Sequence, residues 1–196
     1  MLFRDLTADD IEVRVQSVKQ NGLILLLYKN ARVDMAILDE TVGAENWQRE
    51  HYECKGNLFC RVGINVSSKI DLSGSDGIID IVDRWVWKSD CGVESNTEAQ
   101  KGEASDSFKR ACFNWGIGRE LYTAPFIWIP ASKCNIKEAG KDKYGKPIFK
   151  TNDKFSVEKI SIENKRIVGL SIINTSIQSD KMSDKRVFLL LPEDKK

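Results

Sequence analysis

Apolar and polar residues alternate near the start of the chain in the way expected of a β-hairpin. Residues 11–18 read IEVRVQSV, and residues 23–28 form a short apolar run. Asn21-Gly22 stands between the two segments, and Asn-Gly flanked by strand-like runs is a strong hairpin signal. We therefore predict two antiparallel strands joined by a tight turn.

The period then changes to that of a helix. Asn30 is a suitable N-cap, apolar residues follow at helical spacing in two stripes, and Gly43 is a typical stop. Arg32 lies between the two stripes. From the pattern alone, its simplest role is an ion pair with Asp39 or Glu45.

Three further segments, 47–54, 58–67 and 78–88, read as antiparallel strands separated by turn-forming residues. Trp85 and Trp87 share one face of the last strand. Two tryptophans in register are able to stack on bases, but burial beneath a helix is the interpretation that we favour.

A longer helix is predicted from about Glu98 to Trp115. Thr97 to Gln100 has the form of a capping box, and Gly116 is suited to ending the helix. The apolar residues Ala104, Phe108, Ala111 and Trp115 fall on one stripe, as in a half-buried helix.

Lys109 and Arg110 lie away from this stripe and flank Phe113 in the helical projection. Cations beside an aromatic ring suit single-stranded nucleic acid, because phosphates need positive charge and bases stack on any aromatic face. A solvated charged face, with Phe113 buried against a neighbour, fits the same pattern equally well.

After Pro125 the chain becomes richer in lysine and in strand signals. Residues 126–129 form a short apolar run, and residues 155–162, 166–173 and 187–191 alternate enough to be strands. A turn-rich basic segment between them is expected to form a loop or hairpin that attracts phosphates diffusely. Its lysines are Lys133, Lys137, Lys141, Lys143, Lys146, Lys150 and Lys154.

The composition is that of one globular domain. The 196 residues are 41% hydrophobic, which is enough for one good core. The sequence contains no apolar run long enough to span a membrane, and the first ten residues lack the features of a secretory signal. The five cysteines show no CxxC spacing and are expected to be reduced thiols. We therefore expect a cytoplasmic protein.

The net charge of +1 conceals an asymmetry. From Lys101 onward there are 19 Lys and Arg against 12 Asp and Glu, whereas the first hundred residues carry 11 against 17. Such an uneven distribution of charge favours binding of a polyanion on the carboxy-terminal side. It is also able to align subunits head to tail. A merely solvated charged surface is the alternative.

The residues of common catalytic sites are missing. There is no GxxxxGK[ST] loop for a nucleoside triphosphate. His51 has no partner suited to a general base, so we expect neither an enzyme nor a cofactor. A Mg²⁺ nuclease remains a less favoured alternative. Its candidate ligands are Asp76, Asp80, Asp83, Asp90 and Glu94.

The long helix carries a resemblance to a known family. Residues 101–122, KGEASDSFKRACFNWGIGRELY, resemble the signature helix of the single-strand annealing proteins of the Rad-fifty-two superfamily, particularly the small phage-encoded Sak-like members. The similarity extends to residues 31–33, 38–47 and 85–92. The chain differs from the eukaryotic members at Phe113, because those members carry a basic residue at this position.

This resemblance implies an ATP-independent protein that binds single-stranded DNA and anneals complementary strands in recombination and repair. Its expected partners are single-stranded DNA, further copies of itself in a ring and a single-stranded DNA-binding protein; no metal or membrane is implied. The expected DNA-binding residues are Arg32, Lys101, Lys109, Arg110, Phe113 and Arg119, with Lys133, Lys137, Lys141 and Lys143 as an outer set. A protein that only coats and protects DNA ends is the main alternative.

We predict an α+β fold with two helices packed on an antiparallel sheet of hairpin and meander, followed by a β-rich segment. In this interpretation residues 1–130 form the annealing core, which mediates oligomerisation and DNA binding. Residues 131–196 form a basic loop and a β-rich extension of the same domain.

Overall fold

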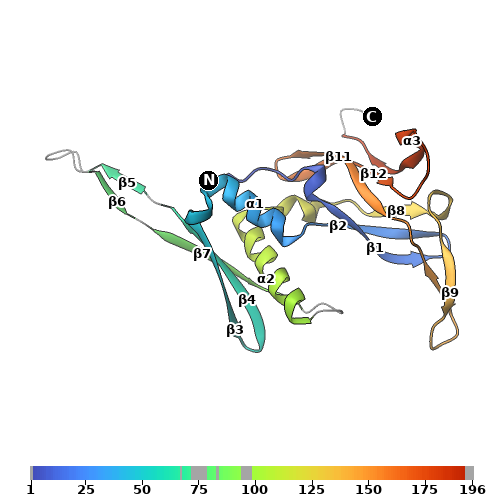
Figure 1. The fold of residues 1–196 in the computed structure, drawn as a ribbon, viewed down its shortest axis with the longest axis horizontal. Helices are drawn as coiled ribbons and strands as arrows, with labels where there is room; N and C mark the ends of the chain where they lie inside the picture. Colours follow the sequence, from blue (N-terminus) through green and yellow to red (C-terminus); the bar gives the residue numbers. More distant parts are fainter. Residues whose placement is uncertain (1, 67, 72–78, 83, 94–98, 193–196) are drawn as a thin grey trace. The chain divides into compact units, whose positions relative to one another are not determined.

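The computed structural model describes residues 2–66, 68–71, 79–82, 84–93 and 99–192 (Figure 1). Contacts between residues divide the chain into two compact units. Unit 1 comprises Met1–Arg4 and Ala31–Gly118, and unit 2 comprises Asp5–Asn30 and Arg119–Lys196. Each unit mixes antiparallel strands with helical segments, which confirms the predicted α+β class.

Unit 1 is built on a three-stranded antiparallel sheet. Its strands are β3 (Trp47–Cys54), β4 (Asn57–Asn65) and β7 (Trp85–Cys91), in the order β3-β4-β7. The helices α1 (Ala31–Val42) and α2 (Ala99–Trp115) lie on the same side of this sheet (Figure 1). The 3-10 turn η2 (Ala44–Asn46) joins α1 to β3.

The predicted single strand at 78–88 is strand over most of its length, but it is divided in the structure. It is two strands, β6 (Ile79–Val82) and β7, which belong to different sheets, because β6 pairs with β5 (Ser68–Asp71) in a separate hairpin. The pairing between β4 and β7 reaches only as far as Asn65, which lies opposite Trp85, so β7 begins there. One further backbone hydrogen bond, from the Val66 amide to the Arg84 carbonyl oxygen, lies beyond this last pair.

The apolar stripe of α2 is confirmed as the contact with the sheet. Phe108, Ala111 and Cys112 are fully buried, as are Val62 and Ile64 on β4. The Trp115 Nε1 atom donates to the Val62 carbonyl oxygen at 2.9 Å. The helix ends at Trp115 as predicted, with Gly116 at a φ of 99°. Of the predicted capping box, Thr97 and Glu98 lie outside the described residues, and Ala99 and Gln100 begin the helix.

The preferred burial of Trp85 and Trp87 beneath the helix is wrong. Lys88 on β7 contacts the carboxy-terminal end of α2, so the side chains that alternate with it point to the other face. Trp85 is 36% exposed there. The sequence shows that the two tryptophans share a face, but not which face α2 covers.

Gly92, just after β7, lets α2 approach the sheet closely. A Cβ atom at this position would lie 2.1 Å from the Glu103 carbonyl oxygen of α2. Because that neighbour is backbone, the helix would have to move. We expect Gly92→Ala to lower the free energy of unfolding by about 2 kcal/mol or more, measured by urea denaturation.

Ser89→Ala, an exposed position on the same strand, is the control and should change stability by less than about 0.5 kcal/mol. Equal stability of Gly92→Ala and the wild type would contradict this account of the packing.

Unit 2 contains a six-stranded antiparallel sheet in the order β13-β12-β11-β1-β2-β8. The predicted amino-terminal hairpin is confirmed as β1 and β2, but β1 also pairs with β11 and β2 with β8. The hairpin therefore belongs with the carboxy-terminal strands. The strands are β1 (Glu12–Lys19), β2 (Gly22–Tyr28), β8 (Ile127–Pro130), β11 (Phe155–Glu163), β12 (Arg166–Asn174) and β13 (Arg186–Leu190).

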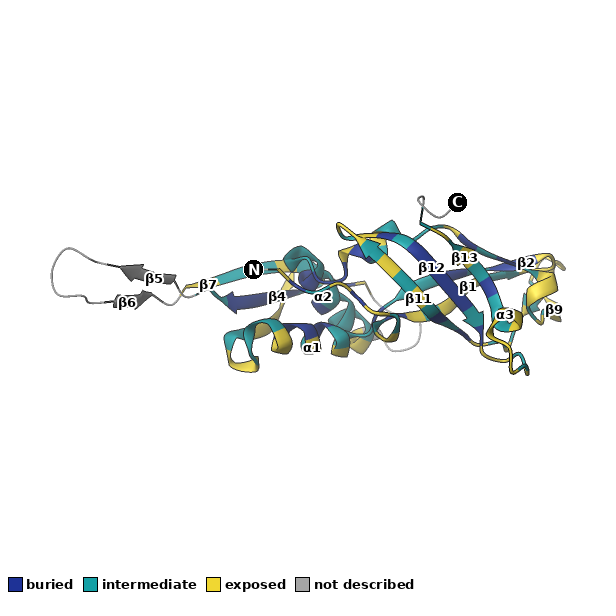
Figure 2. Ribbon diagram, turned by 90° about the horizontal axis from the view of Figure 1, so that it is seen from above, coloured by how far each residue is buried: buried dark blue, intermediate teal, exposed yellow. Residues whose placement is uncertain are grey.

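The sheet of unit 2 curls, because β8 and β13 at the two ends of its strand order also contact each other. Figure 2 shows buried positions along its strands. The buried side chains include Leu23, Leu25, Ile129 and Ile172. Short elements complete the unit. They are η1 (Ala8–Asp10), η3 (Arg119–Thr123), η4 (Ala131–Lys133), β9 (Lys137–Lys141), β10 (Pro147–Lys150) and α3 (Met182–Lys185).

An ion pair links β11 to β13 within this sheet. Arg186 donates two hydrogen bonds to Glu158, at 2.8 and 2.7 Å, and the Ser171 hydroxyl donates a third. The Arg186 and Ser171 hydrogen bonds lower the pKa of Glu158 to about 2. The carboxylate thus stays ionised in all but strongly acidic solution.

Candidate nucleic-acid interface

The ten residues predicted to bind DNA are divided between the units. Unit 1 carries Arg32 on α1, and Lys101, Lys109, Arg110 and Phe113 on α2. Unit 2 carries Arg119 at the start of η3, and Lys133, Lys137, Lys141 and Lys143 on η4, β9 and the turn that follows.

Lys109 and Arg110 lie at the edge of the contact between α2 and the sheet. Their sequence neighbours Phe108 and Ala111 are fully buried, whereas Lys109 and Arg110 are half-buried. Packing therefore fixes the backbone that carries both cations. Within the described part of the chain, Lys109 makes no ion pair or hydrogen bond, so its ammonium group is available to an anion.

Arg110 has an acidic neighbour that sequence reasoning missed. Its Nε atom lies 3.5 Å from Asp90 Oδ1 on β7, and the two side chains are 39% and 29% exposed. Asp90 is itself held in place, because Oδ1 accepts the Cys91 amide and Oδ2 accepts the Asn114 side-chain amide. The sequence signalled Asp90 only as a candidate metal ligand.

Asp90 reduces the positive charge that Arg110 presents to a phosphate. We expect Asp90→Asn, which keeps the shape of the side chain, to strengthen binding of single-stranded oligonucleotides by about two- to fivefold. Fluorescence anisotropy at low and at high salt measures this change. If binding instead became weaker, Asp90 would act chiefly by orienting the guanidinium group.

Lys88 is a second residue whose contacts were not foreseen. Its Nζ atom donates to the Asn114 carbonyl oxygen at 2.9 Å and lies 4.5 Å from the centre of the Trp115 ring. A cation at this position satisfies a carbonyl at the carboxy-terminal end of α2. Lys88 thus stabilises the helix that carries Lys109 and Arg110.

The remaining predicted residues of unit 1 differ in exposure. Arg32 on the first turn of α1 and Lys101 on α2 are exposed, and Phe113 is half-buried. Asp39, proposed as one partner of Arg32, accepts a hydrogen bond from Trp47 Nε1 at 2.6 Å.

In unit 2 the basic segment forms a hairpin of β9 and β10. A hairpin was one of the two forms predicted for this segment, and a loop was the other. Lys137 and Lys150 are direct cross-strand partners, and both are exposed. Like charges placed opposite one another repel, and a bound anion relieves this repulsion. Lys133, Lys141 and Lys143 are also exposed.

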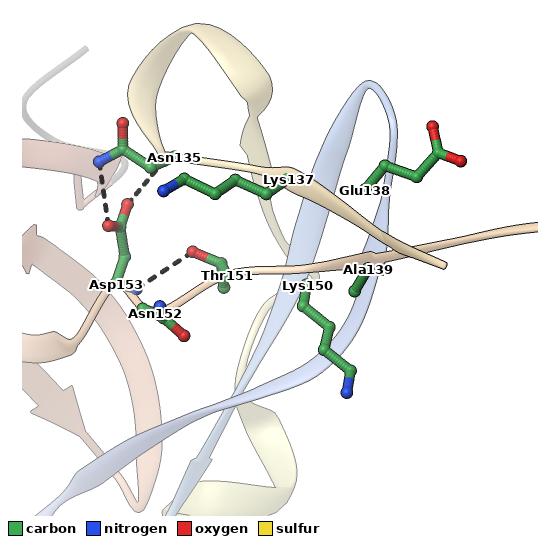
Figure 3. A pocket seen from close by; sticks show the side chains of 8 residues that line it. All are labelled: Asn135, Lys137, Glu138, Ala139, Lys150, Thr151, Asn152 and Asp153. Atoms are coloured by element: carbon green, nitrogen blue, oxygen red, sulfur yellow. Dashed lines mark hydrogen bonds between the residues drawn. The ribbon is translucent and has the colours of Figure 1, made fainter. Parts of the chain in front are cut away.

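An open pocket of about 480 Å³ lies at the base of this hairpin and includes Lys137 and Lys150 in its lining (Figure 3). Asp153 lines one side of the pocket. Its carboxylate is held in place because it accepts hydrogen bonds from the backbone and side chain of Asn135 and from the side chain of Asn174. The pocket therefore offers cations from two strands beside a fixed carboxylate.

The competing nuclease constellation falls mostly outside the described residues, which include Asp90 and the backbone of Asp80 but not Asp76, Asp83 or Glu94. Across the described ranges, no group of three or more His, Cys, Asp and Glu side chains is arranged to hold a metal ion. His51 Nε2 lies 3.1 Å from the Ala104 carbonyl oxygen, so this nitrogen carries the proton.

The five cysteines are all free thiols, and burial raises the pKa of Cys60 to about 11. In the part of the chain that the structure describes, no helix is both long and apolar enough to cross a bilayer.

Cations held by packed secondary structure, together with exposed lysines on a hairpin, are typical of a protein that binds a polyanion. The sequence profile of the Rad52/22 family double-strand break repair protein matches residues 1–138. The chain therefore belongs to this family. The match includes all of unit 1 and, from unit 2, the strands β1, β2 and β8. No curated protein and no solved structure matched the chain.

Proposed function

We propose that the protein binds single-stranded DNA and pairs complementary strands without nucleotide hydrolysis, as a ring-like homo-oligomer in recombination and repair. The family match over residues 1–138 is the observation that supports this most strongly, because it covers both helices with the predicted inner cations. The phage-type, Sak-like subfamily is the member group that we favour, with the cytoplasm of a bacterial host as its location.

Annealing makes modest chemical demands on a protein. Two strands repel through their phosphates, and cations lower this repulsion. An extended strand with accessible bases can then test a complement, and base stacking of roughly 1.4 kcal/mol per step drives the pairing. A rigid cationic surface is sufficient for these steps.

We assign the inner contacts with the phosphates to Arg32, Lys109 and Arg110, supported by Lys101 and Arg119. The Lys109 ammonium group, which has no ion-pair or hydrogen-bond partner among the described residues, and the fixed backbone of α2 support this assignment. Phe113 stacks on a base or seals an interface between subunits. The exposed lysines Lys133, Lys137, Lys141 and Lys143 form a weaker, outer set whose attraction to phosphates is diffuse.

Mixing labelled complementary oligonucleotides with the purified protein, without ATP, tests the proposal. An annealing protein accelerates pairing, whereas a protein that only protects ends slows it. Adding Mg²⁺ to the same mixture tests the nuclease alternative through shortened products. Slower or unchanged pairing by a protein that binds single strands would refute annealing and favour end protection.

A further inference from the structure

The three-stranded sheet of unit 1 has an aromatic face that its own helices do not cover. Strand alternation places Tyr52 of β3, Phe59 and Arg61 of β4, and Trp85 and Trp87 of β7 on the side opposite α2. We call these five residues the aromatic sheet face.

The side chains of the aromatic sheet face contact one another. Tyr52 stacks on Phe59 with ring centres 5.5 Å apart, and the rings of Trp85 and Trp87 lie 6.3 Å apart. The Arg61 guanidinium lies 4.6 Å from the centre of the Trp87 ring. The face is therefore largely ordered before any partner binds.

Gly63 explains how Trp87 lies flat against the sheet. A Cβ atom at this position would come within 2.8 Å of the indole ring, so the ring occupies the space that any side chain would need. The result is a low aromatic surface rather than a projecting side chain. Such surfaces suit broad contacts with another protein.

The described residues leave this face accessible to solvent. Tyr52 and Trp85 are each 36% exposed, and the Arg61 side chain is 43% exposed. Three strands about 4.8 Å apart and roughly 25 Å long give the sheet face an area on the order of 350 Å². A standard interface buries about 800 Å² on each partner, so the face supplies roughly half of one.

The charge of this face disfavours nucleic acid as its occupant. Arg61 Nη2 lies 2.6 Å from Glu50 Oε2, so its one guanidinium is matched by a carboxylate. Phosphates need uncompensated cations. Lys109, which has no ion-pair partner in the described chain, lies on α2, the helix that covers the opposite side of the sheet.

A second copy of this chain is the occupant that the size of the face favours. In a ring each copy is held by two neighbours through two different surfaces. A face of about half the standard area, whose two charges already pair with each other, is therefore suited to contact a different surface of the next copy. We infer that the aromatic sheet face is a contact surface between copies of this protein. This inference rests on the self-association included in the proposed function.

Substitutions at the two most exposed rings test the inference. Trp85→Glu and Tyr52→Glu, singly and together, place a carboxylate in the contact while leaving the core under α2 intact. We expect the double variant to self-associate at least about tenfold more weakly, as a loss of oligomer mass in light scattering over a concentration series. Circular dichroism and the melting temperature show whether each variant is folded.

Tyr144→Glu is the matched control, because Tyr144 is a 75% exposed aromatic residue in unit 2. It should keep the mass of the wild type. The inference fails if the folded double variant also keeps that mass, or if the wild type is a monomer. It also fails if the double variant keeps its mass but loses single-strand binding, since the face would then stack on bases.

The annealing assay distinguishes failure of this inference from failure of the proposed function. If the variants lose oligomer mass while the wild type does not accelerate pairing of complementary strands, the contact surface is supported and the annealing activity is refuted. If the wild type anneals and every folded variant keeps its mass, annealing stands and the assignment of the surface does not.

Discussion

Replacing Lys109 and Arg110 together by Ala is expected to weaken binding of single-stranded DNA and to flatten its dependence on salt. Each phosphate contact that is lost removes roughly one unit from the log-log slope, so the double variant should lose up to about two. The expected loss is large because packed α2 fixes both cations. Anisotropy titrations between low and moderate salt measure the slope and the affinity together.

The control for this pair is Lys19→Ala with Lys181→Ala, two exposed lysines outside the predicted site. This control removes the same net charge, so it separates a local contact from a general loss of attraction. If both double variants lowered affinity and slope equally, or if neither did, Lys109 and Arg110 would have no special part in binding.

Trp115→Ala is expected to lower the free energy of unfolding by about 3 kcal/mol or more. The indole contributes its packing between α2 and β4, the hydrogen bond to the Val62 carbonyl oxygen and the contact with Lys88. Urea denaturation followed by circular dichroism measures the change. Trp115→Phe should lose less, chiefly the hydrogen bond of about 1 kcal/mol.

Trp85→Ala serves as the comparison for Trp115→Ala. It also removes a tryptophan side chain, but from the face of the β3-β4-β7 sheet that α2 does not cover. A clearly smaller loss is expected there. An unchanged melting temperature for Trp115→Ala would mean that the contact between α2 and β4 contributes little to stability.

Local sequence signals predicted the elements well. Asn21-Gly22 marked the first hairpin, and Gly43 and Gly116, with φ values of 86° and 99°, marked the ends of α1 and α2. The strands β11 and β12 were placed within a residue of their observed ends. These features depend on the conformational preferences of a few adjacent residues, so the sequence alone is sufficient to find them.

Relations between distant segments were not accessible in the same way. The pairing of Glu12 with Ser156 joins strands that no local pattern connects. The face of β7 that α2 covers depends on tertiary packing, and both faces of that strand carry large side chains. Alternation identifies residues that share a face, but not the face that is buried.

The candidate site shows the same limit. The helix that carries Lys109 and Arg110 was found from its apolar stripe and from the family resemblance. The acidic partner of Arg110 was not, because Asp90 is twenty residues away and becomes a neighbour only when β7 packs against α2. Helical periodicity describes one element at a time, whereas ion pairs between elements depend on the fold.

The division of the chain between the units has a consequence for how it folds during synthesis. Residues 31–118 of unit 1 are continuous, so they can leave the ribosome and fold while β1 still lacks β11 and β2 still lacks β8 as a partner. The early hairpin must therefore wait with two unpaired edges, of which the β2 edge is largely apolar. Limited proteolysis of ribosome-bound chains that end before β11 should show β4 and α2 protected while β1 is still cleaved, and equal protection of β1 would contradict this order.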